Sequence, residues 1–163
     1  MAGVPGDSIM EEDTQKGKFL TFPLGGEDYG IEIKYVTEIV GIQAITTIPD
    51  IPEYIKGIIN LRGKIIPVMD VRLRFKKEPI AYGGRTCIVV IEIKEVTIGL
   101  IVDSVSEVIS IPDENIVAPP QMNSSFHNTF IESIAKVGNE VKLILHCDRL
   151  LNEEVLEEIG TLA

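Results

Sequence analysis

The chain is poor in the residue types that build metal sites and redox centres. Its 163 residues include two cysteines, two histidines and no tryptophan. Cys87 and Cys147 each stand inside an apolar run, where a thiol is usually a small buried side chain rather than half of a disulfide or redox pair. His127 lies in the polar stretch NSSFHNTF and His146 in LILHCD, so these four residues lack the spacing of a zinc site. We therefore expect no metal and no other cofactor.

Positive charge and aromatic side chains are also scarce. Fifteen Lys and Arg stand against 25 Asp and Glu, which gives a net charge of −10, and aromatic residues make up 6% of the chain. A nucleic-acid binder usually presents a basic face, and a barrel that binds single strands adds exposed aromatics, so both classes are disfavoured. No signal peptide opens the chain, and no apolar run approaches the roughly 20 residues of a membrane span. The sequence predicts a soluble, cytoplasmic protein.

No arrangement of side chains typical of an enzyme is present in the sequence. It has no glycine-rich phosphate loop and no G-x-S-x-G motif. Ser124 and Ser125 stand beside His127, but neighbours in a polar loop seldom hold a nucleophile and a base in place without a third group. A second candidate pair, Asp70 and Asp148, is better explained by helix capping or by pairing with nearby arginines. We predict a binding module.

Short strands dominate the expected secondary structure. Residues 1–17 combine glycine, proline and acids without any period, which predicts a disordered tail. Apolar residues at helical spacing predict a terminal helix over about 148–159. Between them, runs rich in Ile and Val predict strands at 18–25, 29–36, 44–49, 57–62, 64–71, 86–93, 96–102, 104–111, 130–137 and 140–147.

The chain also contains an internal repeat. Three pairs of segments align in the same order: 18–40 with 87–109, 54–63 with 130–139 and, after two extra residues, 64–73 with 142–151. In this alignment Asp70 falls on Asp148. Each copy has enough strands for a small closed barrel, which has no exposed edges. We expect two five-stranded barrels, over about 18–85 and 86–147, and the alternative is one larger β-sandwich.

The stretch GIINLRGKIIPVMDVR, residues 57–72, predicts a hairpin that turns at Arg62 and Gly63. Side chains of a strand alternate between its faces, so Ile59 and Leu61 share the inner face while Asn60 and Arg62 point outward. An exposed arginine at a turn is by itself common on a solvated surface.

Taken together, these motifs resemble those of CheW, the coupling protein of bacterial and archaeal chemotaxis. The resemblance rests on YGIEIKYVTEIV, EYIKGIINLRGKIIPVMDVR and VTIGLIVDSVSEVISI, and it extends from about Lys18 to Leu156. It implies two SH3-like five-stranded β-barrels around a shared apolar core, a C-terminal helix and no enzymatic activity. It also implies two partners, the cytoplasmic tips of methyl-accepting chemotaxis receptors and the regulatory domain of the histidine kinase CheA. The protein would be recruited to receptor arrays at the inner face of the membrane without inserting into it.

The resemblance also assigns residues to two surfaces. The receptor-binding surface would include Val36, Glu38, Ile39, Arg62, Gly99, Val105 and Val108. The kinase-binding surface would include Ile42, Ile45, Thr46, Gly57, Met122 and Phe126. Core packing is the alternative for the three valines, and a bend or close backbone approach is the alternative for the two glycines. A detached CheA regulatory domain and a CheV-like protein are alternatives within the fold, disfavoured because the sequence has neither kinase motifs nor a receiver domain.

Overall fold

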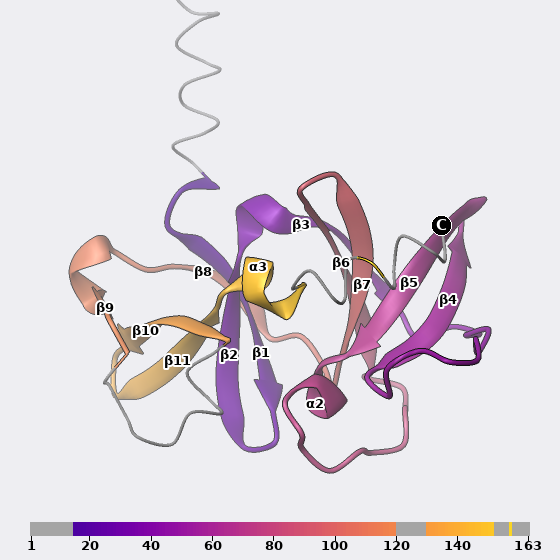
Figure 1. The fold of residues 1–163 in the computed structure, drawn as a ribbon. Coiled ribbons are helices and arrows are strands. Elements are labelled where there is room, and N and C mark those ends of the chain that lie inside the picture. The colour runs from indigo at the N-terminus through magenta and orange to yellow at the C-terminus, as the bar shows by residue number, and fades with distance from the viewer. Residues whose placement is uncertain (1–14, 120–129, 152–156, 158–163) are drawn as a thin grey trace, which may run out of the picture.

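The computed structural model describes residues 15–119, 130–151 and 157, which form two curled β-sheets (Figure 1). The mostly β fold predicted from the sequence is confirmed. The strands are β1 (Lys18–Leu24), β2 (Glu27–Glu32), β3 (Val36–Gly41), β4 (Ile55–Leu61), β5 (Lys64–Asp70), β6 (Cys87–Ile93), β7 (Val96–Val102), β8 (Glu107–Ser110), β9 (Ile116–Val117), β10 (Ile131–Val137) and β11 (Glu140–Leu145). Short helices are α2 (Val71–Arg74), α3 (Cys147–Leu150), and the 3-10 turns η1 (Ile33–Tyr35) and η2 (Asp113–Asn115).

The two sheets do not follow the two halves of the chain. The five-stranded sheet has the order β3-β6-β7-β5-β4, and the six-stranded sheet has the order β8-β1-β2-β11-β10-β9. One sheet is therefore formed within residues 36–102, and the other joins β1 and β2 to strands that begin at residue 107. The expected boundary between residues 85 and 86 is not the boundary between the sheets.

Exchange of one two-stranded hairpin in each direction, β1–β2 for β6–β7, explains this arrangement. After β2 the chain passes through η1 and pairs β3 with β6, and after β7 it pairs β8 with β1. The β1–β2 and β6–β7 hairpins each have a first strand with an open side. Each half of the chain covers the open strand of the other half, so the backbone groups of β1 and β6 are paired on both sides.

The internal repeat has a structural counterpart in the later hairpins. Both β4–β5 and β10–β11 connect through a two-residue turn, and each has a bulge near the start of its first strand. The bulge lies between Ile55 and Gly57 in β4 and between Ile131 and Ser133 in β10. The pairs that flank the turns are Leu61 with Lys64 and Val137 with Glu140. Equivalent residues in these two hairpins therefore share one register.

This register corrects one part of the predicted alignment. No residues are inserted after the second turn, so Asp70 corresponds to His146 and not to Asp148. Asp70 is the N-cap of α2 and His146 is the N-cap of α3. The Asp70 carboxylate accepts a hydrogen bond from the Leu73 N–H at 3.3 Å, which confirms a capping role for this residue.

The largest apolar cluster lies between the two sheets, as the shared core implied by the resemblance requires. Phe22 and Ile31 enter it from the six-stranded sheet, and Ile98 and Leu100 enter it from the five-stranded sheet. These side chains are fully buried, and burial of each contributes about 1.5–3 kcal/mol. Smaller clusters fill the interior of each curled sheet: Ile59, Ile66, Val68, Ile88, Val90 and Ile101 in one, and Phe19, Ile111, Ala135 and Ile144 in the other.

Three local predictions differ from the described structure or extend beyond it. The strand expected at 44–49 is reduced to one isolated bridge between Thr46 and Ile58. Gly17 belonged to the expected tail, but its carbonyl accepts a hydrogen bond from the Ile111 N–H at 2.8 Å. The helix expected over about 148–159 begins as α3, but most of its residues lie outside the described residues, as do residues 1–14 of the expected tail.

Candidate protein-binding surface

The β4–β5 hairpin turns through Arg62 and Gly63, as predicted. Both residues have positive φ, 52° and 88°, and two successive residues of this kind form the turn that matches the twist of paired strands. Asn60 fixes the turn, because its Oδ1 accepts a hydrogen bond from the Gly63 N–H at 2.7 Å. The left-handed conformation costs a non-glycine residue such as Arg62 about 1–2 kcal/mol. The Arg62 side chain is 69% exposed, as predicted from strand alternation.

Arg62 reaches across the sheet to Glu38 on β3. Its Nη2 donates a hydrogen bond to Glu38 Oε2, and this bond and the carboxylate charge raise the pKa of Arg62 above its ordinary value. Because β3 and β4 are the two edges of the five-stranded sheet, the ion pair joins the edges of a curled sheet. Exposed ion pairs contribute little stability. The pair therefore orients two side chains at the rim rather than holding the fold together.

The backbone of Thr46 pairs with β4, one edge strand of the five-stranded sheet. The Thr46 N–H donates to the Ile58 carbonyl at 2.8 Å, and the Ile58 N–H donates to the Thr46 carbonyl at 2.9 Å. Gly57 is buried beside this bridge with a φ of 145°, and a Cβ there would lie 2.0 Å from the Thr46 carbonyl oxygen. The close backbone approach considered from the sequence is therefore present at Gly57.

Two aliphatic side chains on edge strands are open to solvent. Ile39 on β3 is 40% exposed and Val108 on β8 is 50% exposed. The repeat places them at equivalent positions, one in each sheet. Val36 and Val105 are half-buried and pack against the shared core, so core packing, the alternative to a binding role, is present for these two.

Several other residues assigned by resemblance lie inside the molecule. Gly99 is buried, and a Cβ there would meet Ile88 Cγ2 at 2.6 Å. Ile42 and Ile45 are half-buried against the cluster inside the five-stranded sheet, whereas Thr46 is exposed. Thr46 therefore lies on the surface, whereas Gly99, Ile42 and Ile45 belong to the packing of the five-stranded sheet.

The described ranges contain no group of three or more His, Cys, Asp or Glu residues that could hold a metal ion. Cys87 and Cys147 are both free thiols. Of the helices in the described part of the chain, none is long and apolar enough to cross a membrane. The residues Met122, Ser124, Ser125, Phe126 and His127 lie outside the described residues.

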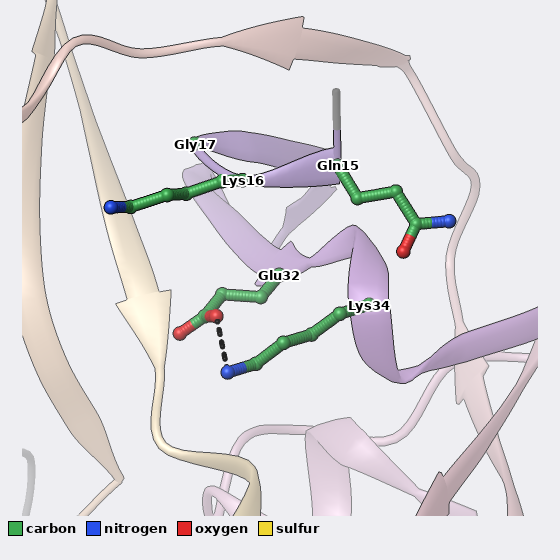
Figure 2. Close-up of a pocket in the computed structure, with 5 residues that line it drawn as sticks. All are labelled: Gln15, Lys16, Gly17, Glu32 and Lys34. Carbon is green, nitrogen blue, oxygen red and sulfur yellow. Dashed lines mark ion pairs between the residues drawn. The ribbon is translucent and has the colours of Figure 1, made fainter. Parts of the chain in front are cut away.

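A shallow hollow of about 410 Å³ lies where the chain enters β1 (Figure 2). It is lined by Gln15, Lys16, Gly17, Glu32 and Lys34. Figure 2 shows Glu32 and Lys34 pointing toward each other, and their Oε2 and Nζ atoms are 3.3 Å apart. The charge of Glu32 raises the pKa of Lys34. The sequence analysis did not single out these residues. All five are exposed or half-buried, and the charges of Glu32 and Lys34 are paired with each other, so we assign this hollow no ligand.

These features define a class of protein. Of the candidate residues that the structure describes, those that reach the surface include two aliphatic side chains on edge strands, Thr46 and a paired arginine at a hairpin tip. Such an arrangement suits contact with another protein, where an apolar centre supplies affinity and charges at the rim fix register.

Comparisons with known proteins identify the family. A family model described as the CheW-like domain matches residues 18–155. The whole chain is 32% identical to the chemotaxis protein CheW of Klebsiella aerogenes and covers 98% of it. Over 84% of the chain it is 31% identical to CheW of Bacillus subtilis, of which it covers 88%. The crystal structure of the scaffolding protein TtCheW from Thermoanaerobacter tengcongensis matches with a TM-score of 0.79 at 40% identity, over 85% of this chain and 94% of that one. The chain belongs to the CheW family, which confirms the resemblance seen in the sequence.

Proposed function

We propose that this chain is a non-enzymatic adaptor that couples the cytoplasmic tips of methyl-accepting chemotaxis receptors to the histidine kinase CheA. The observation that carries the proposal is the match to the CheW-like domain over residues 18–155. The solved relative TtCheW is described as a scaffolding protein, which supports the same role. The adaptor works in the cytoplasm and joins receptor arrays at the inner face of the membrane.

The proposed receptor contact is centred on Ile39 and Val108. A receptor tip is a helical hairpin with apolar ridges, and an exposed aliphatic side chain gains about 25 cal/mol for each Å² that the partner removes from water. Glu38 and Arg62 lie at the rim, where a fixed pair of charges contributes more to register than to affinity. Val36 and Val105 pack against the shared core and so contribute to the contact indirectly. Gly99 contributes only through the packing inside the five-stranded sheet.

The proposed kinase contact is centred on the segment that closes the five-stranded sheet. Thr46 is exposed there, and its backbone is fixed by the bridge to Ile58. Ile42 and Ile45 anchor the segment from inside, and Gly57 allows it to approach β4 closely. In this proposal Met122 and Phe126 contribute a second apolar contact to the kinase.

The test measures binding of the full chain to two purified partners, a receptor cytoplasmic fragment and the CheA regulatory domain. Wild type is compared with Ile39→Asp and with Val141→Asp. Val141 is a matched control, because it is 52% exposed and lies outside both proposed contacts.

We expect wild type and Val141→Asp to bind both partners. Ile39→Asp should weaken receptor binding by at least about tenfold, since it places a charge in an apolar contact, and should leave kinase binding unchanged. Failure of the folded wild-type chain to bind either partner would reject the adaptor function. Equal losses in both aspartate variants would reject the assigned receptor contact.

A further inference from the structure

The side chain of Arg72 joins three segments of the chain. Its Nε and Nη2 atoms donate to the two carboxylate oxygens of Asp103 at 2.8 and 2.7 Å, and its Nη1 donates to the Glu78 carbonyl at 2.9 Å. Arg72 lies on α2, Glu78 on the connection from α2 to β6, and Asp103 directly after β7. The two charged side chains are largely buried, at 14% and 22% exposure. A bidentate bond of this kind fixes the relative orientation of its partners as well as their distance.

The ion pair lies where two parallel strands part. The last paired residues of β5 and β7 are Asp70 and Ile101. Arg72 and Asp103 each follow by two residues, so they extend the register of the two strands beyond the sheet. From this point residues 103–106, the β7–β8 crossover, carry the chain from the five-stranded sheet to the six-stranded sheet. Arg72 therefore holds the place at which the chain leaves one sheet for the other.

The crossover from β2 to β3 is held differently, although the repeat makes it equivalent. Asp103 corresponds to Lys34 in the register that the β1–β2 and β6–β7 hairpins share. Arg72 corresponds to Asp148 in the register of the two later hairpins. Lys34 forms an exposed ion pair with Glu32, two residues before it, and such a pair contributes little to position. The largely buried pair between α2 and the β7–β8 crossover is thus not a consequence of the repeat.

The β7–β8 crossover ends at a second fixed point, on β1. The Ser106 N–H donates to the Thr21 carbonyl at 2.8 Å, and the Thr21 hydroxyl donates to the Glu107 carbonyl at 3.0 Å. β8 begins there and carries Val108, which is 50% exposed. Because the crossover is short, a displacement at Asp103 is passed on to the start of β8.

We propose that Arg72 is a positioning residue of the receptor contact, which fixes the β7–β8 crossover and through it the place of Val108. This inference rests on the proposed function, because Val108 is one of the two residues on which the proposed receptor contact is centred. With β8 fixed in advance, the receptor tip does not have to order it on binding. The residues of the proposed kinase contact do not include any residue of the crossover, so the effect of Arg72 is specific to the receptor.

The first measurement is amide hydrogen exchange of the full chain, followed residue by residue. Arg72→Met removes the charge and all the donors of the side chain, and it should speed exchange at the Ser106 amide by about tenfold. Exchange at the Thr46 amide, in the proposed kinase contact, should stay unchanged. Lys77→Met is the matched control, because Lys77 also forms an ion pair, with Glu27 at 2.8 Å, and this variant should change neither amide.

The second measurement is binding of the folded variants to the receptor fragment and to the kinase regulatory domain. Arg72→Met should weaken receptor binding by about tenfold and leave kinase binding unchanged, and Lys77→Met should bind both partners like wild type. The double variant Arg72→Asp, Asp103→Arg restores an ion pair with its signs exchanged. It should recover part of the receptor affinity and of the Ser106 protection that each single reversal loses.

Each outcome decides one part of the proposal. Unchanged exchange at Ser106 in folded Arg72→Met would overturn the positioning of the crossover. Faster exchange with unchanged receptor affinity, or equal losses of receptor and kinase affinity, would overturn the specific role in the receptor contact. If Arg72→Met does not fold, Arg72→Lys takes its place with a smaller expected loss, since lysine keeps the charge without the bidentate geometry. If wild type binds no receptor fragment, the proposed function fails, and hydrogen exchange alone decides whether Arg72 fixes the crossover.

Discussion

Replacement of Gly57 by alanine should destabilise the fold severely, and the structure sets the size of the effect. At a φ of 145° a residue with a side chain is strained by about 1–3 kcal/mol. The added Cβ would lie 2.0 Å from the Thr46 carbonyl oxygen, so this segment must move. Movement breaks the two backbone hydrogen bonds between Thr46 and Ile58, at about 1 kcal/mol each. Together these contributions predict a loss of about 3–5 kcal/mol, a large part of the total stability of a domain.

Urea unfolding followed by far-UV circular dichroism measures this loss. Gly41→Ala is the matched control, because Gly41 lies in β3, is exposed, lacks positive φ and has no atom within 4 Å of the added Cβ. We expect the control to stay within about 0.5 kcal/mol of wild type. An equally small change in Gly57→Ala would refute the close-approach explanation and would leave the proposed kinase contact as the role of Gly57.

Two further predictions concern a turn and a thiol. Lys94 and Glu95 turn between β6 and β7 with φ of 51° and 66°, where the equivalent turn between β1 and β2 has Gly25 and Gly26. The double variant Lys94→Asn, Glu95→Gly should raise the free energy of unfolding by about 1 kcal/mol in the same urea assay, and a decrease would contradict the assigned strain. Burial, aided by nearby carboxylates, raises the pKa of the Cys147 thiol from 9.0 to about 12, so between these values the unfolded chain ionises while the folded chain does not. Wild type should therefore lose free energy of unfolding relative to Cys147→Ala as the pH rises from about 9 to about 12, and parallel curves would contradict this.

The hairpins could be predicted because their signals are local. Gly25 and Gly26 mark one turn, Arg62 and Gly63 mark another, and the flanking apolar runs have the lengths of strands. The exchange of the β1–β2 and β6–β7 hairpins between the two halves of the chain could not be predicted. A period-2 pattern tells which face of a strand is buried but does not specify its partner. The internal repeat suggested two separate barrels, and the same repeat is equally compatible with strands exchanged between copies.

The candidate site was predictable in outline only. Strand alternation correctly placed Arg62 outside, but its partner Glu38 lies 24 residues away in a chain with many carboxylates. Nothing in the sequence indicated that Gly99 is buried or that Gly57 has a positive φ. A glycine at a binding surface and a glycine at a close backbone approach look the same in a sequence. Arg74 was one cation among fifteen, and only the fold brings its guanidinium over the rings of Tyr54 and Phe130.

The most direct measurement asks whether the chain brings kinase to receptor. Vesicles that carry receptor cytoplasmic fragments are sedimented with CheA, in the presence and absence of the full chain, and the kinase in the pellet is quantified. We expect CheA to sediment with the vesicles only when the wild-type chain is present, and the Ile39→Asp variant to reduce its recovery strongly. Equal recovery of CheA with and without the chain would contradict the proposal that this protein couples the two.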